Sequence, residues 1–152
     1  LNHSVMLSKA FVLIFAQPTW AAQDSLVFLS LPLMTYPNPF QFVEPTELSG
    51  FKFVSGNAEH PSDRFEETTI EILPENPHID LTSLNLQRSS DGNGYVIVGF
   101  FDENGVAEGN INARIVGLIK ELRIVVGKSH ENWAILSEMY LRTPDREKLV
   151  KQ

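Results

Sequence analysis

The chain has 152 residues, of which 43% are apolar and 20% are charged, so we expect one domain with a real hydrophobic core rather than a disordered chain. A formal net charge of −7 repels phosphate backbones and anionic lipid headgroups, which excludes nucleic acid as an expected partner, together with a polybasic membrane contact. The absence of cysteine excludes disulfides, thiolate chemistry and cysteine metal sites.

The N-terminus has the order of a secretion signal of the bacterial type. Lys9 supplies a positive charge, an unbroken apolar run covers 10–16, and a proline and small residues follow. The small residues predict cleavage before Ala22 or one residue later. The apolar run is far shorter than the roughly 20 residues that cross a bilayer, so we expect no transmembrane segment in the mature chain.

These features predict a cleaved signal over 1–22, one domain over 23–152, and a periplasmic or secreted location. The alternative is that residues 5–16 form an ordinary buried strand or helix of the fold.

Beyond the signal, turn residues punctuate the chain at short intervals, as is typical of antiparallel β domains. We expect a first strand over 25–31. A proline-rich stretch over 32–45 should form an edge or a surface crossing, because proline cannot donate to a sheet ladder. Phenylalanines alternate over 40–42 and again over 51–53, which predicts a hairpin with aromatic pairs on one face.

The middle of the chain alternates between strand and turn patterns. Residues 68–73 predict a strand that stops at a proline, and residues 79–86 predict a strand interrupted by a β-bulge. Residues 95–101 are apolar on both faces, so we expect a central strand covered on both sides. A turn over 102–105 follows, with glycine at its last position.

The segment 110–122 is ambiguous. Its isoleucines and leucines have helical spacing, but residues 110–116 also alternate as in a strand, and Gly117 weakens a helix by about 1 kcal/mol. We favour a strand over 110–116. The alternative is an α+β fold with a helix over 110–122.

Two further strands are expected over 122–126 and 133–141, and Thr143 has the signature of an N-cap that begins a short C-terminal helix. The pattern as a whole predicts an all-β, mainly antiparallel fold. We expect a two-sheet β-sandwich of about seven or eight short strands.

One loop resembles a calcium site. Asp91 and Asn93, with Gly94, match positions 3, 5 and 6 of an EF-hand loop, although position 12 falls on Phe100, which cannot ligate calcium. Asp91 and Asn93 are therefore candidate metal ligands for calcium, and no other cofactor is predicted. The alternative is a hairpin loop, where these residue types are favoured for backbone reasons.

The histidines have no metal-binding spacing, and no serine lies in a nucleophile motif. His78 and Asp80 have strand spacing and could form half of a catalytic relay. Loop-edge polar residues explain that pair equally well. The acidic residues over 59–80 could attract a basic partner or a cation, but we favour a solvated loop and an exposed strand face as their explanation.

The leading hypothesis is therefore a non-catalytic, exported binding or assembly module, with an envelope protein or polysaccharide as its expected partner. One alternative is a small secreted hydrolase that uses His60, His78 and Asp80. Another is a calcium-dependent adhesion or carbohydrate-binding module that uses Asp91 and Asn93.

Overall fold

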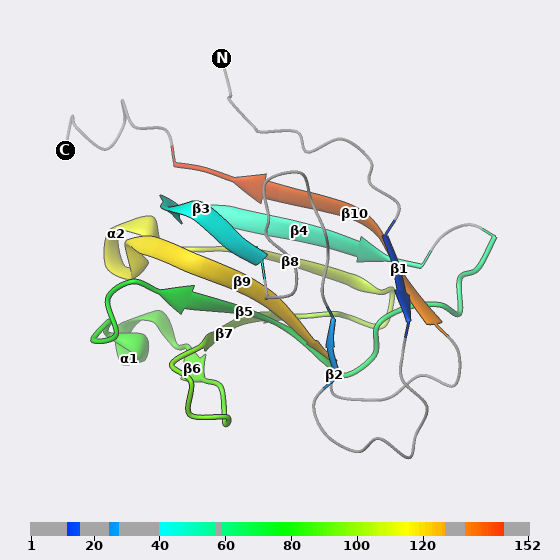
Figure 1. Ribbon diagram of the computed structural model, residues 1–152, viewed down its shortest axis with the longest axis horizontal. Coiled ribbons are helices and arrows are strands. Elements are labelled where there is room, and N and C mark those ends of the chain that lie inside the picture. The colour runs from blue at the N-terminus through cyan, green and yellow to red at the C-terminus, as the bar shows by residue number, and fades with distance from the viewer. Residues whose placement is uncertain (1–11, 16–24, 28–39, 57–58, 127–132, 145–152) are drawn as a thin grey trace.

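The structure is a computed structural model that describes residues 12–15, 25–27, 40–56, 59–126 and 133–144. In these ranges the chain forms two antiparallel sheets packed face to face, with two single-turn helices at one end of the sandwich (Figure 1). The predicted all-β, two-sheet sandwich is confirmed.

The smaller sheet has the strand order β1-β10-β4-β8. These strands are β1 Val12–Phe15, β10 Trp133–Arg142, β4 Gly50–Ser55 and β8 Val106–Asn110. Because β4 and β10 occupy the interior of this sheet, the Phe51 and Phe53 side chains of β4 are held against the facing sheet and are fully buried.

The larger sheet has the order β2-β9-β5-β7-β6, and β3 also pairs with β9. These strands are β2 Ser25–Val27, β3 Phe40–Glu47, β5 Thr68–Pro74, β6 Gln87–Arg88, β7 Val96–Phe100 and β9 Leu118–Val126. Pro45 lies in β3 where its register with β9 shifts, in agreement with the expected edge position, while the prolines over 32–39 lie outside the described residues.

The core between the sheets is built from alternate side chains of the interior strands, as the period of two requires. The Phe51 ring packs so closely on the larger sheet that a Cβ atom at Gly99 would lie 2.7 Å from its Cζ atom. A Cβ atom at Gly109, the β8 partner of Phe51, would lie 2.9 Å from the same atom. The two glycines therefore make room for one large ring.

The predicted hairpin over 40–53 is wrong, because β3 and β4 belong to different sheets. The connection between them passes from one layer of the sandwich to the other, and Leu48 in this connection is buried in the core. The Ser49 N–H donates to the Arg142 carbonyl (2.8 Å). The alternating phenylalanines reflect burial from two sheets into one core rather than pairing across one hairpin.

The predicted strand over 79–86 is also wrong. Helix α1 (Leu81–Leu84) occupies this segment, and the Asp80 carboxylate caps it by accepting from the N–H groups of Thr82 (3.1 Å) and Ser83 (3.2 Å). Asn85 ends the helix with a left-handed φ of 52°. The apparent slip in strand alternation was the signal of this single turn.

The favoured strand over 110–116 is wrong for its second half, where helix α2 spans Ala113–Val116. The Asn112 side chain caps α2 by accepting from the Arg114 N–H (3.2 Å), and Gly117 ends it with a φ of 70°. The alternative helix over 110–122 is too long, since β9 begins directly afterwards at Leu118.

Strand β7 lies between β5 and β6, so the expected interior strand is present. The expectation that both faces are covered is wrong at its end, because Phe100 is 65% exposed. The turn over 102–105 forms as predicted, with Gly105 at a φ of 74° and the Asp102 carboxylate accepting from the Val106 N–H (2.9 Å).

Part of the sequence expectations falls outside the described residues. Strand β1 lies inside the predicted signal and pairs with β10, while 1–11 and 16–22 are not described. The signal over 1–22 and the domain over 23–152 therefore stay predictions, as does the C-terminal helix. No helix in the described part of the chain is long and apolar enough to span a membrane.

Candidate functional site

The outer face of the larger sheet carries a buried pair of opposite charges. Arg123 of β9 and Glu71 of β5 are partners in the sheet register. Their chain neighbours point into the core, so these two side chains point outward. They are nonetheless only 6% and 2% exposed, respectively, which requires something to cover this face of the sheet.

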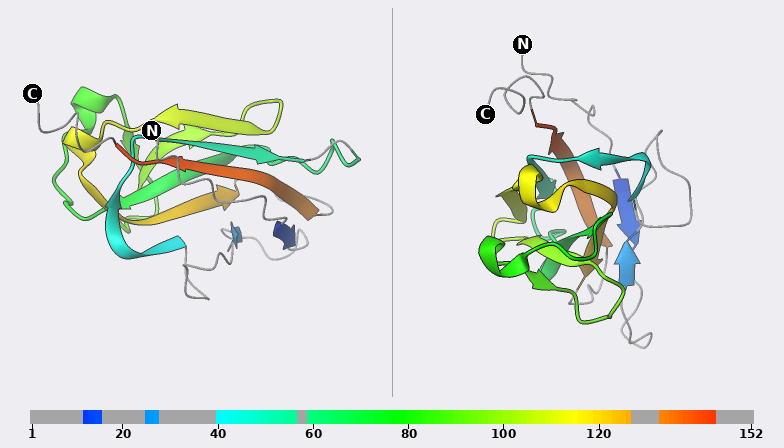
Figure 2. Two further views of the ribbon diagram at one scale, coloured as in Figure 1. Left: turned by 90° about the horizontal axis from the view of Figure 1, so that it is seen from above. Right: turned by 90° about the vertical axis from the view of Figure 1, so that its left-hand side faces the viewer.

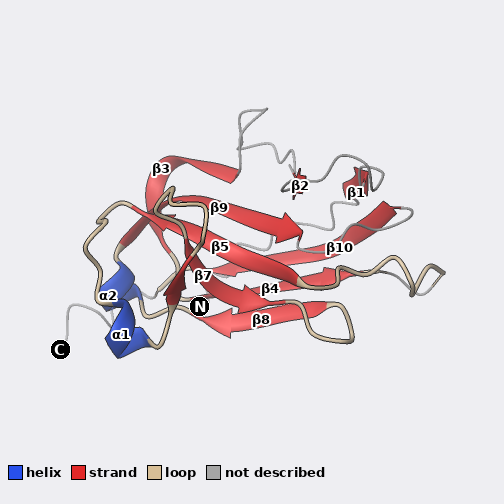
Figure 3. Cartoon of the chain, turned by 90° about the horizontal axis from the view of Figure 1, so that it is seen from below, coloured by secondary structure: helices blue, strands red, loops and turns tan. Residues whose placement is uncertain are grey.

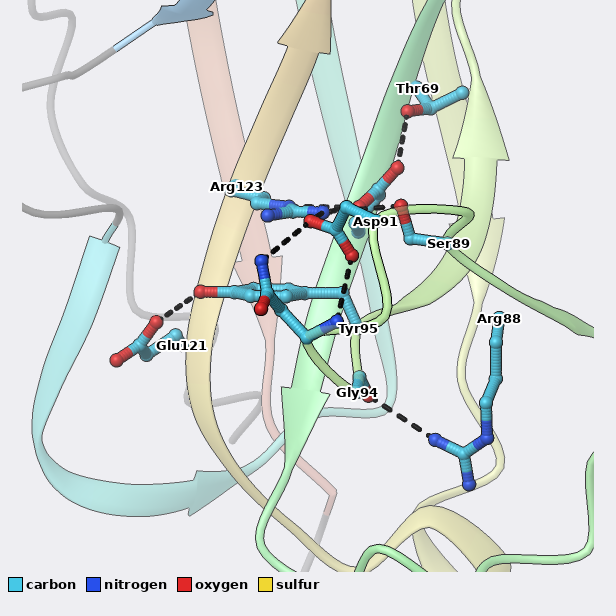
Figure 4. Close-up of polar contacts among 10 residues, drawn as sticks. Thr69, Arg88, Ser89, Asp91, Gly94, Tyr95, Glu121 and Arg123 are labelled. Carbon is cyan, nitrogen blue, oxygen red and sulfur yellow. Dashed lines mark hydrogen bonds and ion pairs between the residues drawn. The ribbon is translucent and has the colours of Figure 1, made fainter. Parts of the chain in front are cut away.

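The cover is the loop over 89–95, which folds back across the sheet (Figure 4). Arg123 donates from Nε (2.8 Å) and Nη2 (2.6 Å) to Glu71 Oε2, and Nη2 also lies 2.6 Å from Asp91 Oδ2 and 3.2 Å from Ser89 Oγ. Its guanidinium carbon stacks 3.6 Å from the centre of the Tyr95 ring. One arginine therefore joins the sheet to both ends of the loop.

The Tyr95 hydroxyl extends the cluster to β9, where it donates a hydrogen bond to the Glu121 carboxylate. Burial raises the pKa of Tyr95, and the hydrogen bond to Glu121 raises it further, since ionisation would place two negative charges together. Tyr95 therefore stays a neutral donor under all ordinary conditions.

Asp91 carries the charge that draws the loop toward the sheet. Burial acts to raise the pKa of Asp91, but the Asn93 N–H (3.0 Å) and Arg123 outweigh it, so the pKa is lowered. For Arg123, burial acts to lower the pKa, whereas Asp91 and Glu71 raise it more strongly. Both groups are therefore ionised, and the cluster is a stable charged clamp.

The clamp leaves the tip of the loop in solvent. Ser90, Gly92 and Asn93 are exposed, and a Cβ atom at Gly92 would meet nothing within 4 Å. Chemically, the arrangement presents a loop tip from a rigid sheet, since the ionised groups beneath the tip are paired with one another.

The candidate metal ligands Asp91 and Asn93 lie together in this loop, as predicted. Asp91 Oδ1 accepts from the Asn93 N–H, and Oδ2 faces both Arg123 and the Asn93 side-chain amide (3.2 Å). The calcium hypothesis for this pair stays a prediction. Among the described residues, no group of three or more histidine and acidic side chains lies close enough to hold a metal ion.

The other candidates are dispersed. The strand face that would align His78 with Asp80 does not exist, because Asp80 caps α1. His60 Nδ1 lies 3.9 Å from Asp63 Oδ2, a buried oxygen that accepts no hydrogen bond from the described residues. The structure therefore brings together a different pair from the one expected from the sequence.

Sequence reasoning missed Glu71 and Arg123 because no local signal connects them. They are separated by 52 positions, and each alternates with apolar neighbours, as an exposed residue of a half-buried strand would. A buried arginine on an outer sheet face can be recognised only once strand order and the covering loop are known.

A separate hollow of about 340 Å³ opens beside the two helices, which lie at the same end of the molecule (Figure 3). Its lining is mainly apolar, with two asparagines at its margin: Leu84, Leu86, Val98, Asn110, Ile111, Asn112 and Val116. The Asn110 and Asn112 side-chain oxygens already accept bonds from Arg142 and from the Arg114 N–H.

The fold and the clamped loop thus define a β-sandwich domain without a recognisable catalytic motif among its described residues. Comparison of the sequence gives its family: residues 37–138 match the MGAT4 C-terminal domain, and the chain belongs to this family.

The relatives are much longer proteins. The chain is 37% identical over 115 residues to human alpha-1,3-mannosyl-glycoprotein 4-beta-N-acetylglucosaminyltransferase B, covering 70% of this chain and 20% of that protein. It is 36% identical over 104 residues to the corresponding transferase A of Gallus gallus, covering 68% of this chain and 19% of that protein. The chain therefore spans about a fifth of the length of the curated relatives it matches.

The family overturns the leading function hypothesis. The description as a non-catalytic, bacterial-type exported module is wrong, because the matched family is a domain found in proteins named N-acetylglucosaminyltransferases. The family match also replaces the two alternative functions, a small hydrolase and a calcium-dependent adhesion or carbohydrate-binding module. The expected location was periplasmic or secreted. The relatives are named as glycoprotein-modifying transferases, which is consistent with a secreted or lumenal orientation, whereas the periplasmic location is not shown.

Proposed function

We propose that this chain acts as the C-terminal domain of an N-acetylglucosaminyltransferase for mannosyl-glycoproteins and that the domain contributes to the transfer reaction. The observation that carries the proposal is the family match over 37–138, supported by 37% identity to the human transferase B. The relatives' names describe transfer of N-acetylglucosamine to an alpha-1,3-mannosyl-glycoprotein.

The lengths of the relatives and the clamp both support a contributing domain within a larger enzyme. The chain corresponds to about a fifth of each relative, so the proposed enzyme contains a much larger transferase portion. The clamp centred on Arg123 makes one face of the larger sheet rigid, which suits a domain that holds other parts of an enzyme or its acceptor in place.

A lumenal location belongs to the same proposal. The relatives' names give a mannosyl-glycoprotein as the acceptor, and glycoprotein acceptors pass through the secretory pathway. The finer location within that pathway follows from the acceptor that the enzyme meets.

The proposal is tested in the human transferase B by replacing its C-terminal domain with residues 12–144 of this chain, which include strands β1 and β2. Transfer of N-acetylglucosamine to a mannosyl-glycoprotein is measured for the parent, the chimera, a truncated enzyme without the domain, and a chimera with an unrelated β-sandwich of equal size. We expect the chimera to approach the parent rate and both controls to be slower.

Two results contradict the proposal. If the chimera is no faster than the truncated enzyme, this chain does not supply the function of the family's domain. If the truncated enzyme is as fast as the parent, the domain does not contribute to transfer at all.

A further inference from the structure

A second feature of the larger sheet lies beside the clamp and is not explained by it. Val125, Thr69 and Phe100 are partners in register across β9, β5 and β7. Their side chains point outward, because Ile70 and Ile124 point into the core. Phe100 is 65% exposed, the largest exposure among the large apolar side chains in the described part of the chain.

The contrast between adjacent rows is informative. The row that contains Arg123, Glu71 and Ile97 is covered by the loop over 89–95, whereas the next row, which ends at Phe100, is not. The domain therefore covers the row of Arg123 and Glu71 with its own loop, whereas in the next row Phe100 is exposed and Thr69 and Val125 are half-buried. Ile97 lies at the border and is partly exposed.

Acidic residues form one margin of this surface. Glu66 and Glu67 precede Thr68, while Asp102 and Glu103 follow Phe101, and all four are exposed. The Phe101 N–H donates to the Thr68 carbonyl (3.0 Å), so the two acidic segments lie side by side. An apolar centre with a charged rim is the usual composition of a protein interface.

We propose that the Phe100 face, formed by Phe100, Thr69, Val125 and Ile97, is the docking surface for the transferase portion of the enzyme. This inference rests on the proposed function. The partner surface is apolar at its centre and basic where it meets Glu66, Glu67, Asp102 and Glu103.

Two observations favour this partner over others. The relatives are about five times as long as the matched segment, so a large protein surface is available within the same enzyme. The family is a C-terminal domain, so this larger portion precedes it. Strand β2, which precedes the matched segment, pairs with β9 beside Val125. Strand β2 therefore lies at the edge of the larger sheet, with Leu26 opposite Val125 of the Phe100 face (strand β2 is the short light-blue arrow in Figure 2).

The chain contains no cysteine, so a single introduced thiol reports on this surface directly. We would compare Phe100→Cys with Glu108→Cys, an exposed control on β8 of the other sheet. Each variant is made in the 152-residue chain and in the chimera with the human transferase B. The rate of maleimide labelling is measured by mass spectrometry on the peptide that carries the new thiol.

We expect both thiols to label rapidly in the isolated chain. In the chimera, we expect labelling of F100C to be about tenfold slower and E108C to be unchanged. A tenfold protection corresponds to about 1.4 kcal/mol of docking free energy. Equal labelling rates of F100C in the isolated chain and in the chimera overturn the proposal. Protection of F100C in the isolated chain that increases with protein concentration also overturns it, because such protection assigns the face to a second copy of the chain.

Activity separates failure of this inference from failure of the proposed function. In the chimera, Phe100→Asp should reduce transfer toward the truncated enzyme, and Phe100→Leu should retain it; the melting temperature of each isolated variant checks folding. An active chimera with a freely labelled F100C thiol and an active F100D variant refutes only the docking surface. An inactive chimera refutes the proposed function, and its labelling result still decides whether the two parts touch.

Discussion

The replacement of Arg123 by methionine tests the clamp most directly. Methionine keeps much of the side-chain length but removes the bonds to Glu71, Asp91 and Ser89 and the stacking on Tyr95. Glu71 is only 2% exposed, so its charge would be left buried without a partner.

The expected loss follows from this geometry. Breaking a buried ion pair by removing one partner costs about 3–5 kcal/mol. Asp91 contributes less to this loss than Glu71, because its side chain is 27% exposed and water can replace part of the lost contact. We therefore expect the melting temperature to fall by about 6–20 °C, at about 2–4 °C per kcal/mol for a chain of this size.

The assay is urea and thermal unfolding followed by circular dichroism, with the free energy of unfolding compared at one pH. Lys52→Met is the matched control, because Lys52 makes an exposed 3.8 Å pair with Glu108 and should contribute no more than about 1 kcal/mol. The double variant Glu71→Leu with Arg123→Met should recover much of the loss, since it removes the unpaired charge. A loss for R123M no larger than that for K52M would refute the interpretation of the cluster as a clamp.

Three further predictions concern the same sheet. Because the pKa of Asp91 is lower in the folded chain, its contribution to stability is complete above about pH 4 and is lost as the pH falls through the folded pKa. Asp91→Asn should therefore make the free energy of unfolding less dependent on pH below about 4. Because the pKa of Tyr95 is higher in the folded chain, its contribution to stability is complete below about pH 10 and falls as the pH rises above that value. Tyr95→Phe should remove this loss of stability at alkaline pH, measured by urea unfolding between pH 9 and 11. Gly99→Ala places a Cβ atom 2.7 Å from the Phe51 ring and should cost about 1–3 kcal/mol in the same assay, and an unchanged midpoint would contradict the tight packing.

The fold class was predictable because period-two alternation and regular turns act over a few residues. Residues 68–73 and 122–126 were identified correctly on this basis, and both are interior strands with one fully buried face. The errors occurred where a single capping side chain decides the structure. Asp80 and Asn112 each close one helical turn inside a segment whose apolar pattern also suits a strand.

The candidate site was predictable only in part. The loop that contains Asp91 and Asn93 was identified from its turn residues, but its partner Arg123 lies 32 positions away on a strand. No periodicity connects a loop to the outer face of a sheet, because that contact depends on the order β9-β5-β7. The family match extends over residues 37–138, and no short motif in this range was recognised from the sequence.

The clamp and the Phe100 face occupy neighbouring rows of one sheet, and the loop over 89–95 covers the first row but not the end of the second. A buried arginine and glutamate on an outer face are tolerated because the loop over 89–95 excludes water from them. The loop does not cover the end of the neighbouring row, where Phe100 is exposed. The two features therefore separate experimentally: R123M should lower the free energy of unfolding of the isolated chain, whereas F100D should leave it unchanged and alter only the contact with the transferase portion.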